Sequence, residues 1–340
     1  MKPRQLAFLT AFVAALAAAV AYQTVSHDRA TSQSDTRPVL DVNVVAEEIN
    51  RVVVTQGGAD STRVVVEKLP DRWVVRTAWD HEADERKVRE LIDALNGLRG
   101  EFRSDDASVL ADYGLGPDAD PASITVTLYG ADWQEVAAVE LGAASQGGVF
   151  LREPGRDAAY LSRTDVLGKL GMWGGPKAPE QRTFLDLDVF QCDPADIRSI
   201  TLTEGDEVLR LEKTFAAADS TGAADPSTWE WVLTQPERRP LAKTKADGLM
   251  TALTKVQAAD VADPKADWRG YGLWKAPRRV EVGLADGGTF ELRWGEERDA
   301  GPGTQEGVYV MSSRDQTVWV IRKFKADQIF KTLADLLPES

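Results

Sequence analysis

Cysteine and histidine are scarce in this chain of 340 residues. It contains one cysteine, Cys192, and two histidines, His27 and His81. One cysteine cannot form a disulfide within the chain, and three such residues cannot supply the four ligands of a structural zinc site. A serine or cysteine nucleophile usually needs a histidine base, so the same shortage argues against nucleophilic catalysis.

Basic residues are also in deficit. The chain has 40 lysines and arginines against 54 aspartates and glutamates, which gives a net charge of −14, and no dense basic run is interleaved with aromatic residues. Phosphate backbones are bound by clustered positive charge, so we predict no nucleic-acid binding. The acidic balance equally argues against a body that lies flat on anionic lipid.

Motifs for phosphate or metal chemistry are missing as well. The glycines form no G-x-G-x-x-G pattern and no Walker-type Gly-Lys-Ser/Thr. Local acidic clusters lack the ligand spacing of a calcium loop and are interpreted as solvated turn residues; they are Asp118, Asp120, Glu204, Asp206 and Glu207. Among 54 acids nothing selects a glycosidase-type carboxylate pair. We predict no catalytic residue, no cofactor and no metal site.

His81 is the one histidine outside the N-terminal region. It lies in an acidic stretch, and the position 158 residues later is Arg239. A repeated active-site base would keep its residue type, so we predict a surface histidine with no role in catalysis.

The N-terminus carries a hydrophobic segment. Lys2 and Arg4 precede an uncharged run of 17 residues, Leu6 to Tyr22, which as a helix is about 25 Å long. The hydrocarbon core is ~30 Å thick, so the run is at the short end for a spanning helix. Ala19-Val20-Ala21 also resembles a signal-peptide cleavage site. Residues 1–25 are therefore a retained transmembrane anchor or a signal peptide, and in both cases the chain after Tyr22 is exported. Residues 26–39, polar from His27 to Pro38, are predicted to be a flexible tether.

The rest of the chain contains an internal repeat. Trp73 and Trp231 lie in short β-like runs, and each is followed 40 positions later by the tyrosine of a Tyr-Gly-Leu sequence, Tyr113 and Tyr271. The offset between the two copies is 158 residues, which matches two domains of ~150 residues each. The recurring tryptophans and tyrosines are predicted to be core residues.

Each copy contains one amphipathic helix and one alternating strand. Apolar residues at helical spacing in the first copy map onto apolar residues in the second: Val88, Leu91, Ile92, Leu95 and Leu98 onto Ala246, Leu249, Met250, Leu253 and Val256. Such a stripe is buried most simply against a sheet. Alternating apolar residues then predict a half-buried strand in each copy: Ile124, Val126 and Leu128, then Val280, Val282 and Leu284.

Further strands are expected from valine-rich and apolar runs bounded by glycine and proline. They cover 42–45, 51–54, 63–66, 136–141, 149–152 and 159–161, then 197–203, 208–211, 290–294, 307–311 and 318–321, and a helix is expected over 326–337. The Gly- and Pro-rich stretch from Gly171 to Pro179 is the predicted boundary. The fold class is α+β, with tandem repeats over 40–178 and 179–340, each a mostly antiparallel sheet with one main helix.

The order of these motifs carries a family resemblance. A Trp-containing strand, a helix, Tyr-Gly-Leu with a following proline, and a late Leu141-Gly142 or Trp294-Gly295 come after a single hydrophobic segment. This arrangement, over most of residues 40–335, resembles a bacterial family of membrane-anchored domains of unknown function. Members are often encoded beside gliding-motility-type ABC transporter components. The resemblance implies a single-pass inner-membrane anchor, a body in the periplasm or another extracytoplasmic space, and a transporter-accessory role, with no catalytic residue carried over.

Two tryptophans are least easily explained as core. Trp173 lies in the Gly-rich linker and Trp274 directly follows the second Tyr-Gly-Leu. Exposed tryptophan anchors protein interfaces and stacks on sugar rings, so both are candidates for a partner or ligand surface. We expect a non-catalytic, membrane-anchored accessory or interaction subunit that binds a membrane protein such as an ABC transporter permease. The alternatives are an extracytoplasmic glycan or peptidoglycan binder, with a weak hydrolase as its catalytic version, and a structural spacer.

Overall fold

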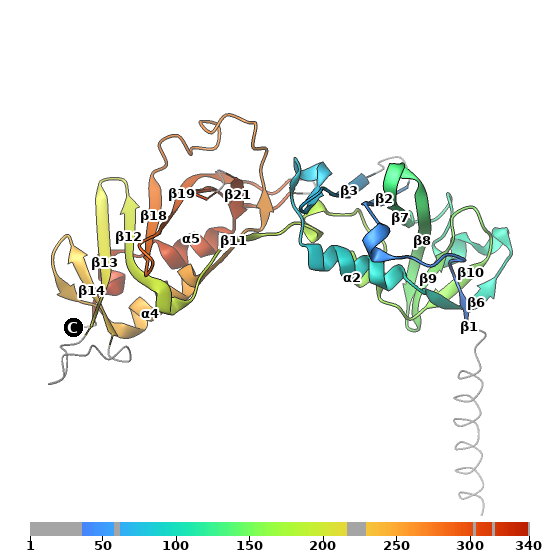
Figure 1. Cartoon of the computed structure of the whole chain (residues 1–340), viewed down its shortest axis with the longest axis horizontal. Coiled ribbons are helices and arrows are strands. Elements are labelled where there is room, and N and C mark those ends of the chain that lie inside the picture. Colours follow the sequence, from blue (N-terminus) through green and yellow to red (C-terminus); the bar gives the residue numbers. More distant parts are fainter. Residues whose placement is uncertain (1–35, 58–61, 216–228, 302–303, 315–316, 339–340) are drawn as a thin grey trace, which may run out of the picture. The chain divides into compact units, whose positions relative to one another are not determined.

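The computed structural model describes residues 36–57, 62–215, 229–301, 304–314 and 317–338 (Figure 1). The predicted anchor, residues 1–25, and most of the predicted tether lie outside these ranges. Within them, no helix is long and apolar enough to cross a membrane. The end of the predicted tether is not a tether, because Thr36–Pro38 forms strand β1 and pairs with Arg99–Glu101.

The chain divides into two compact units. Among the described residues, the first unit comprises those up to Arg63 together with Arg89–Pro179, and the second comprises Val64–Val88 together with those from Glu180 onward. Both are built mainly from antiparallel strands with few helices, which confirms the predicted α+β class. The second unit therefore includes Val64–Val88, a segment that comes before most of the first unit in the sequence.

The first unit has a meandering antiparallel sheet. Its described strands, in their order across the sheet, are β1 (Thr36–Pro38), β6 (Arg99–Ser104), β10 (Ala159–Ser162), β9 (Gly148–Arg152), β8 (Glu135–Ser145), β7 (Ile124–Tyr129) and β2 (Arg51–Gln56). In β7 the predicted alternation is confirmed, because Ile124, Val126 and Leu128 are fully buried between half-buried residues.

The second unit holds the other strands. Its larger sheet runs β15 (Arg239–Pro240), β14 (Trp229–Gln235), β13 (Glu207–Phe215), β12 (Ile197–Glu204), β18 (Arg278–Leu284), β19 (Thr289–Arg298), β20 (Gly307–Ser312), β21 (Val318–Ile321) and β17 (Asp260–Val261). A separate pair joins β11 (Asp188–Gln191) to β16 (Lys255–Gln257), and the 64–88 segment supplies most of β3 (Thr62–Lys68) with β4 (Trp73–Val75) and β5 (His81–Glu82).

Backbone hydrogen bonds join the 64–88 segment to the rest of the second unit. The Asp84 N–H donates to the Phe184 carbonyl at 2.8 Å, and the Asp186 N–H donates to the Glu82 carbonyl at 3.0 Å. Ala83 and Leu185, between these pairs, form an antiparallel bridge. The segment is thus held by the same type of pairing that holds a strand in a sheet.

One main helix per repeat is confirmed. Helix α2 (Glu85–Leu95) begins after Asp84, whose carboxylate accepts from the Lys87 N–H, and it ends before Gly97, which has φ +64°. A left-handed glycine is a common helix terminator. Helix α4 (Lys243–Thr254) is the counterpart. The predicted apolar stripes are buried in both, although Leu98 and Val256 lie just beyond the helix ends.

The remaining helices are short. They are α3 (Val166–Lys169), α5 (Lys323–Ile329), α6 (Leu333–Leu336) and the 3-10 turns η1 (Ala46–Glu48), η2 (Arg76–Ala78), η3 (Ala107–Val109), η4 (Ala111–Tyr113), η5 (Ala131–Trp133), η6 (Gln181–Thr183) and η7 (Pro194–Asp196).

Two sequence expectations about these elements are wrong. Residues 42–45 form no strand and lead instead into η1. The single helix expected over 326–337 is two helices. The backbone leaves helical geometry at Phe330, and a reciprocal capping pair of Thr332 and Asp335 starts α6. Side-chain capping of this kind favours a new helix start over continuation.

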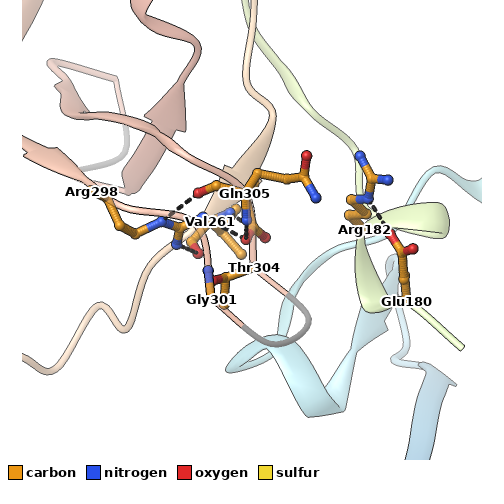
Figure 2. Close-up of polar contacts among 8 residues, drawn as sticks. Glu180, Arg182, Val261, Arg298, Gly301, Thr304 and Gln305 are labelled. Atoms are coloured by element: carbon orange, nitrogen blue, oxygen red, sulfur yellow. Dashed lines mark hydrogen bonds and ion pairs between the residues drawn. The ribbon is translucent and has the colours of Figure 1, made fainter. Parts of the chain in front are cut away.

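Among the described residues, each unit contains a buried ion pair of an arginine and an acid. In the first, Arg152 Nε lies 2.6 Å from Glu140 Oε2, and in the second, Arg298 Nη2 lies 2.7 Å from Asp260 Oδ2. Arg298 also donates to the carbonyls of Gln305 and Val261 (Figure 2). Multiple hydrogen bonds offset the desolvation of buried charges, so these pairs fix the loops that they reach.

Candidate functional site

The Tyr-Gly-Leu sequence of the first repeat forms a tight turn. Gly114 has φ +68°, its N–H donates to the Ala111 carbonyl at 2.9 Å, and the Leu115 N–H donates to the Leu110 carbonyl at 2.9 Å. These two bonds and the left-handed glycine are the features of a Schellman turn. Leu115 is buried and the Tyr113 ring stacks on Phe150, with ring centroids 4.7 Å apart.

The second repeat reproduces this turn. Gly272 has φ +70°, its N–H donates to the Arg269 carbonyl at 3.1 Å, and the Leu273 N–H donates to the Trp268 carbonyl at 2.9 Å. Tyr271 packs on another strand aromatic, Tyr309, at 4.4 Å between centroids. The repeated sequence motif is therefore a repeated backbone structure.

Trp173 lies at the turn of the first repeat. Its side chain is 78% exposed, and it lines a cavity of about 390 Å³ together with Gly114, Ala143 and Pro121. Trp173 follows Gly114 by 59 positions in the sequence. The cavity wall is largely glycine, alanine and proline, so it leaves backbone and small side chains accessible beside a large aromatic ring.

Trp274 lies at the turn of the second repeat, directly after Leu273. It is 62% exposed, and the Arg269 guanidinium carbon lies 5.3 Å from its ring centroid. Both tryptophans singled out in the sequence are thus exposed at the same turn of their own repeats.

Two more exposed tryptophans were not distinguished in the sequence. Trp79 is 43% exposed and Trp133 is 52% exposed. Both have positive φ next to a positive-φ aspartate, in the pairs Trp79-Asp80 and Asp132-Trp133. The adjacent aspartate is the only sequence signal, because aspartate tolerates left-handed geometry. Arg51 covers Trp133, with its guanidinium carbon 3.3 Å from a ring centroid.

His81 is half-buried, so the expectation that its side chain is exposed at the surface is wrong. It pairs with Val75 as part of β5, is half-buried, and meets the Trp319 ring edge-on at 4.7 Å between centroids. Its Nε2 lies 3.1 Å from the Asp186 carbonyl oxygen. The short β5 strand carries the ring inward, which no periodic pattern in the sequence indicates.

His81 and Trp79 line a cavity of about 300 Å³ in the second unit. Its charged lining is Arg72, Asp80, Glu82, Asp186 and Asp188. Arg76 holds two carboxylates of this region, with Nη1 2.9 Å from Asp80 and Nη2 2.8 Å from the buried Glu67. The hydrogen bonds that Arg76 donates to Glu67 and Asp80 raise the pKa of its guanidinium group.

The described residues contain no group of three or more histidine, cysteine or acidic side chains placed to hold a metal ion. Cys192 is half-buried. Burial first, and then the nearby Asp196 and Asp193, raise the pKa of its thiol, which opposes formation of the nucleophilic thiolate.

The fold and its two turns define a duplicated α+β protein that exposes one tryptophan beside the Tyr-Gly-Leu turn of each repeat. The family described as domain of unknown function DUF4340 matches residues 73–230 and, a second time, residues 231–339. The chain belongs to this family, which confirms the expected family of unknown function and its duplication. The two matches begin at Trp73 and Trp231, the first residues of the repeated pattern. No curated protein and no solved structure is significantly similar to the chain.

Proposed function

We propose that this protein is a non-catalytic, membrane-anchored, extracytoplasmic subunit that binds a membrane protein partner, such as the permease of an ABC-type transporter. The observation that supports it is the pairing of an exposed tryptophan with the Tyr-Gly-Leu turn in both repeats: Trp173 beside Gly114, and Trp274 beside Leu273.

Physical reasons favour a partner at these positions. A tryptophan ring can bury roughly 150–250 Å² in an interface, and tryptophan is enriched among the residues that dominate binding energy. The Schellman turn holds the backbone beside each ring rigidly, so little ordering is needed on binding. Two exposed tryptophans on one chain provide two contacts, which increases the total strength of binding when both are engaged.

The membrane location rests on the N-terminal sequence, Lys2 and Arg4 followed by Leu6–Tyr22. A retained anchor would hold both repeats near a membrane partner, and the resemblance to families encoded beside transporter components suggests which partner to seek.

Co-purification from mild detergent tests the proposal. Full-length wild-type protein should retain a membrane protein partner, and the double variant Trp173→Ala, Trp274→Ala should lose it. Trp133→Ala, which removes an exposed tryptophan away from either turn, is the matched control and should retain the partner. Recovery of the wild-type chain alone, or equal recovery with the double variant, would contradict the proposal.

A second candidate function is glycan binding at the cavity lined by Trp79 and His81. The supporting observation is an exposed tryptophan beside Glu82, Asp186 and Asp188. The apolar face of a sugar ring packs on indole, and planar carboxylates accept hydrogen bonds from its hydroxyl groups. A volume of about 300 Å³ is within the range of small-molecule sites.

Calorimetric titration of the full-length chain with soluble peptidoglycan fragments tests this candidate. Binding should fall in Trp79→Ala and in Glu82→Gln and should persist in Trp133→Ala. No heat of binding in the wild type, or equal binding in all four proteins, would rule it out.

A further inference from the structure

The second unit contains another cavity, of about 390 Å³, whose charged lining is entirely basic. Its cationic residues are Arg182, Lys255, Arg322 and Lys325, and no carboxylate is among the described residues that line it. The chain as a whole has a net charge of −14, so the charge at this cavity is opposite in sign to that of the chain.

Three separate segments bring these cations together. Arg182 belongs to η6, Lys255 begins β16, and Arg322 and Lys325 come from the start of α5, directly after β21. Phe324, which is 56% exposed, lines the cavity between the two residues from α5.

The four cations differ in their pairing. Arg182 forms an ion pair with Glu180, as Figure 2 shows. Lys255, Arg322 and Lys325 have no carboxylate within 4.0 Å among the residues that the structure describes. The adjacent Lys323, outside the cavity, does pair with Glu297. An acidic side chain therefore pairs with a lysine of α5 outside the cavity, and none lies among the described residues that line the cavity.

Lys325 is partly removed from water in this arrangement. Its side chain is half-buried, and burial lowers the pKa of its ammonium group with no acidic group acting in the opposite direction. Removing an ammonium group from water without a counter-ion is unfavourable. Stability alone would favour an acid or an apolar residue here, so the cluster is better explained by an anion that it binds.

We propose that this cavity binds a phosphate-bearing anion. Arg322 can donate two parallel hydrogen bonds to phosphate oxygens, Lys255 and Lys325 add point charges, and Arg182 adds the guanidinium nitrogens that its bond to Glu180 does not use. Four cationic side chains are more than one carboxylate ligand would require, and they suit a phosphate group, which carries up to two negative charges. Phe324 at the cavity offers an apolar surface for the remainder of the ligand. The inference does not depend on the interaction role proposed above.

The test uses the full-length chain, kept in neutral detergent when inorganic phosphate is the probe and freed of detergent when vesicles are the probe. The vesicles are of phosphatidylcholine, with or without phosphatidylglycerol. Arg322→Gln and Lys325→Gln should each weaken binding about tenfold or more, because each removes a charge-assisted contact. Lys325→Arg should retain binding. Lys275→Gln, which removes an exposed lysine elsewhere in the second unit, is the matched control and should bind like the wild type.

The pattern of results separates the sources of phosphate. Binding of inorganic phosphate supports a soluble phosphate compound, and binding only to vesicles that contain phosphatidylglycerol supports a lipid headgroup. In either case the loss must follow Arg322→Gln, an exposed position where misfolding is not expected. The proposal is overturned by no binding of either probe, by equal binding in Arg322→Gln and Lys275→Gln, or by stronger binding of an acidic peptide than of phosphate.

Discussion

Gly142 lies so close to Tyr113 that a Cβ on Gly142 would be 2.3 Å from the Tyr113 carbonyl oxygen. In the second repeat a Cβ on Gly295 would be 2.0 Å from the Tyr271 carbonyl oxygen. No side chain fits at such distances, so each repeat needs glycine where β8 or β19 passes its Tyr-Gly-Leu turn. The late Leu-Gly and Trp-Gly of the sequence pattern are explained by this contact.

We predict that Gly142→Ala and Gly295→Ala each lower the free energy of unfolding by about 1–3 kcal/mol, because the turn and strand must separate. Denaturant titration measures the change. Gly248→Ala, in the exposed middle of α4 with no neighbouring atom within 4 Å of the added Cβ, is the control. It should be neutral or stabilising by up to about 1 kcal/mol. An equal loss in Gly142→Ala and Gly248→Ala would contradict the packing described.

The buried pair of Glu140 and Arg152 gives a second prediction. Arg152→Met leaves the Glu140 carboxylate buried without its cation, which should destabilise the protein by about 3–5 kcal/mol. Thermal and chemical unfolding measure it. Asp247→Asn breaks the exposed pair with Lys243 and should cost less than about 1 kcal/mol. A small effect of Arg152→Met would mean that water reaches Glu140.

Acid should weaken the first unit through the same carboxylate. Burial would raise the pKa of Glu140, but hydrogen bonds from Ser123, the Gly116 N–H and Arg152 outweigh it and lower the pKa below the ordinary glutamate value. A lowered pKa in the folded state contributes stability above the unfolded-state value, about 4.3. That contribution is lost as the pH falls from there through the folded-state value.

Unfolding free energies measured between about pH 6 and pH 3 should therefore decline more steeply in the wild type than in Glu140→Gln. The variant is expected to be less stable at neutral pH. Parallel curves for the two proteins would show that Glu140 titrates alike in the folded and unfolded chain.

Cys192 should react slowly. Burial, Asp196 and Asp193 raise the pKa of its thiol, so at pH 8 the thiolate fraction is below that of a free cysteine. Alkylation by iodoacetamide, followed by mass spectrometry across pH, should be slower in the folded protein than in urea. Asp196→Asn should speed the reaction by removing a nearby negative charge. Equal rates for folded and unfolded protein would disprove the shielding.

The sequence predicted the parts of the fold that depend on periodicity. The stripes of α2 and α4, the alternation in β7 and the spacing from tryptophan to tyrosine are local patterns, and the structure reproduces them. Residues 42–45 show where composition misleads, because a valine-containing run without a pairing partner forms no strand.

The candidate sites depend on contacts between distant segments, which single-sequence patterns do not encode. Trp173 lines one cavity with Gly114, and Arg182 lines another with Lys325, although long stretches of sequence separate the members of each pair. The burial of His81 was not predicted for the same reason, because its contacts Trp319 and Asp186 are distant from it in the sequence. The net charge of −14 is an average over the chain and does not indicate the local cluster of basic residues around Lys325.

The membership of Val64–Val88 in the second unit affects how the gene can be dissected. A fragment that starts at Glu180 would lose the partners of Phe184, Leu185 and Asp186 and the ring that faces Trp319. Such a truncation would expose unsatisfied amides and an apolar edge, a combination that promotes aggregation. A gene divided at the Gly171–Pro179 linker would thus encode an incomplete second unit. Two separately expressed fragments should reassemble only when the second fragment also includes residues 64–88.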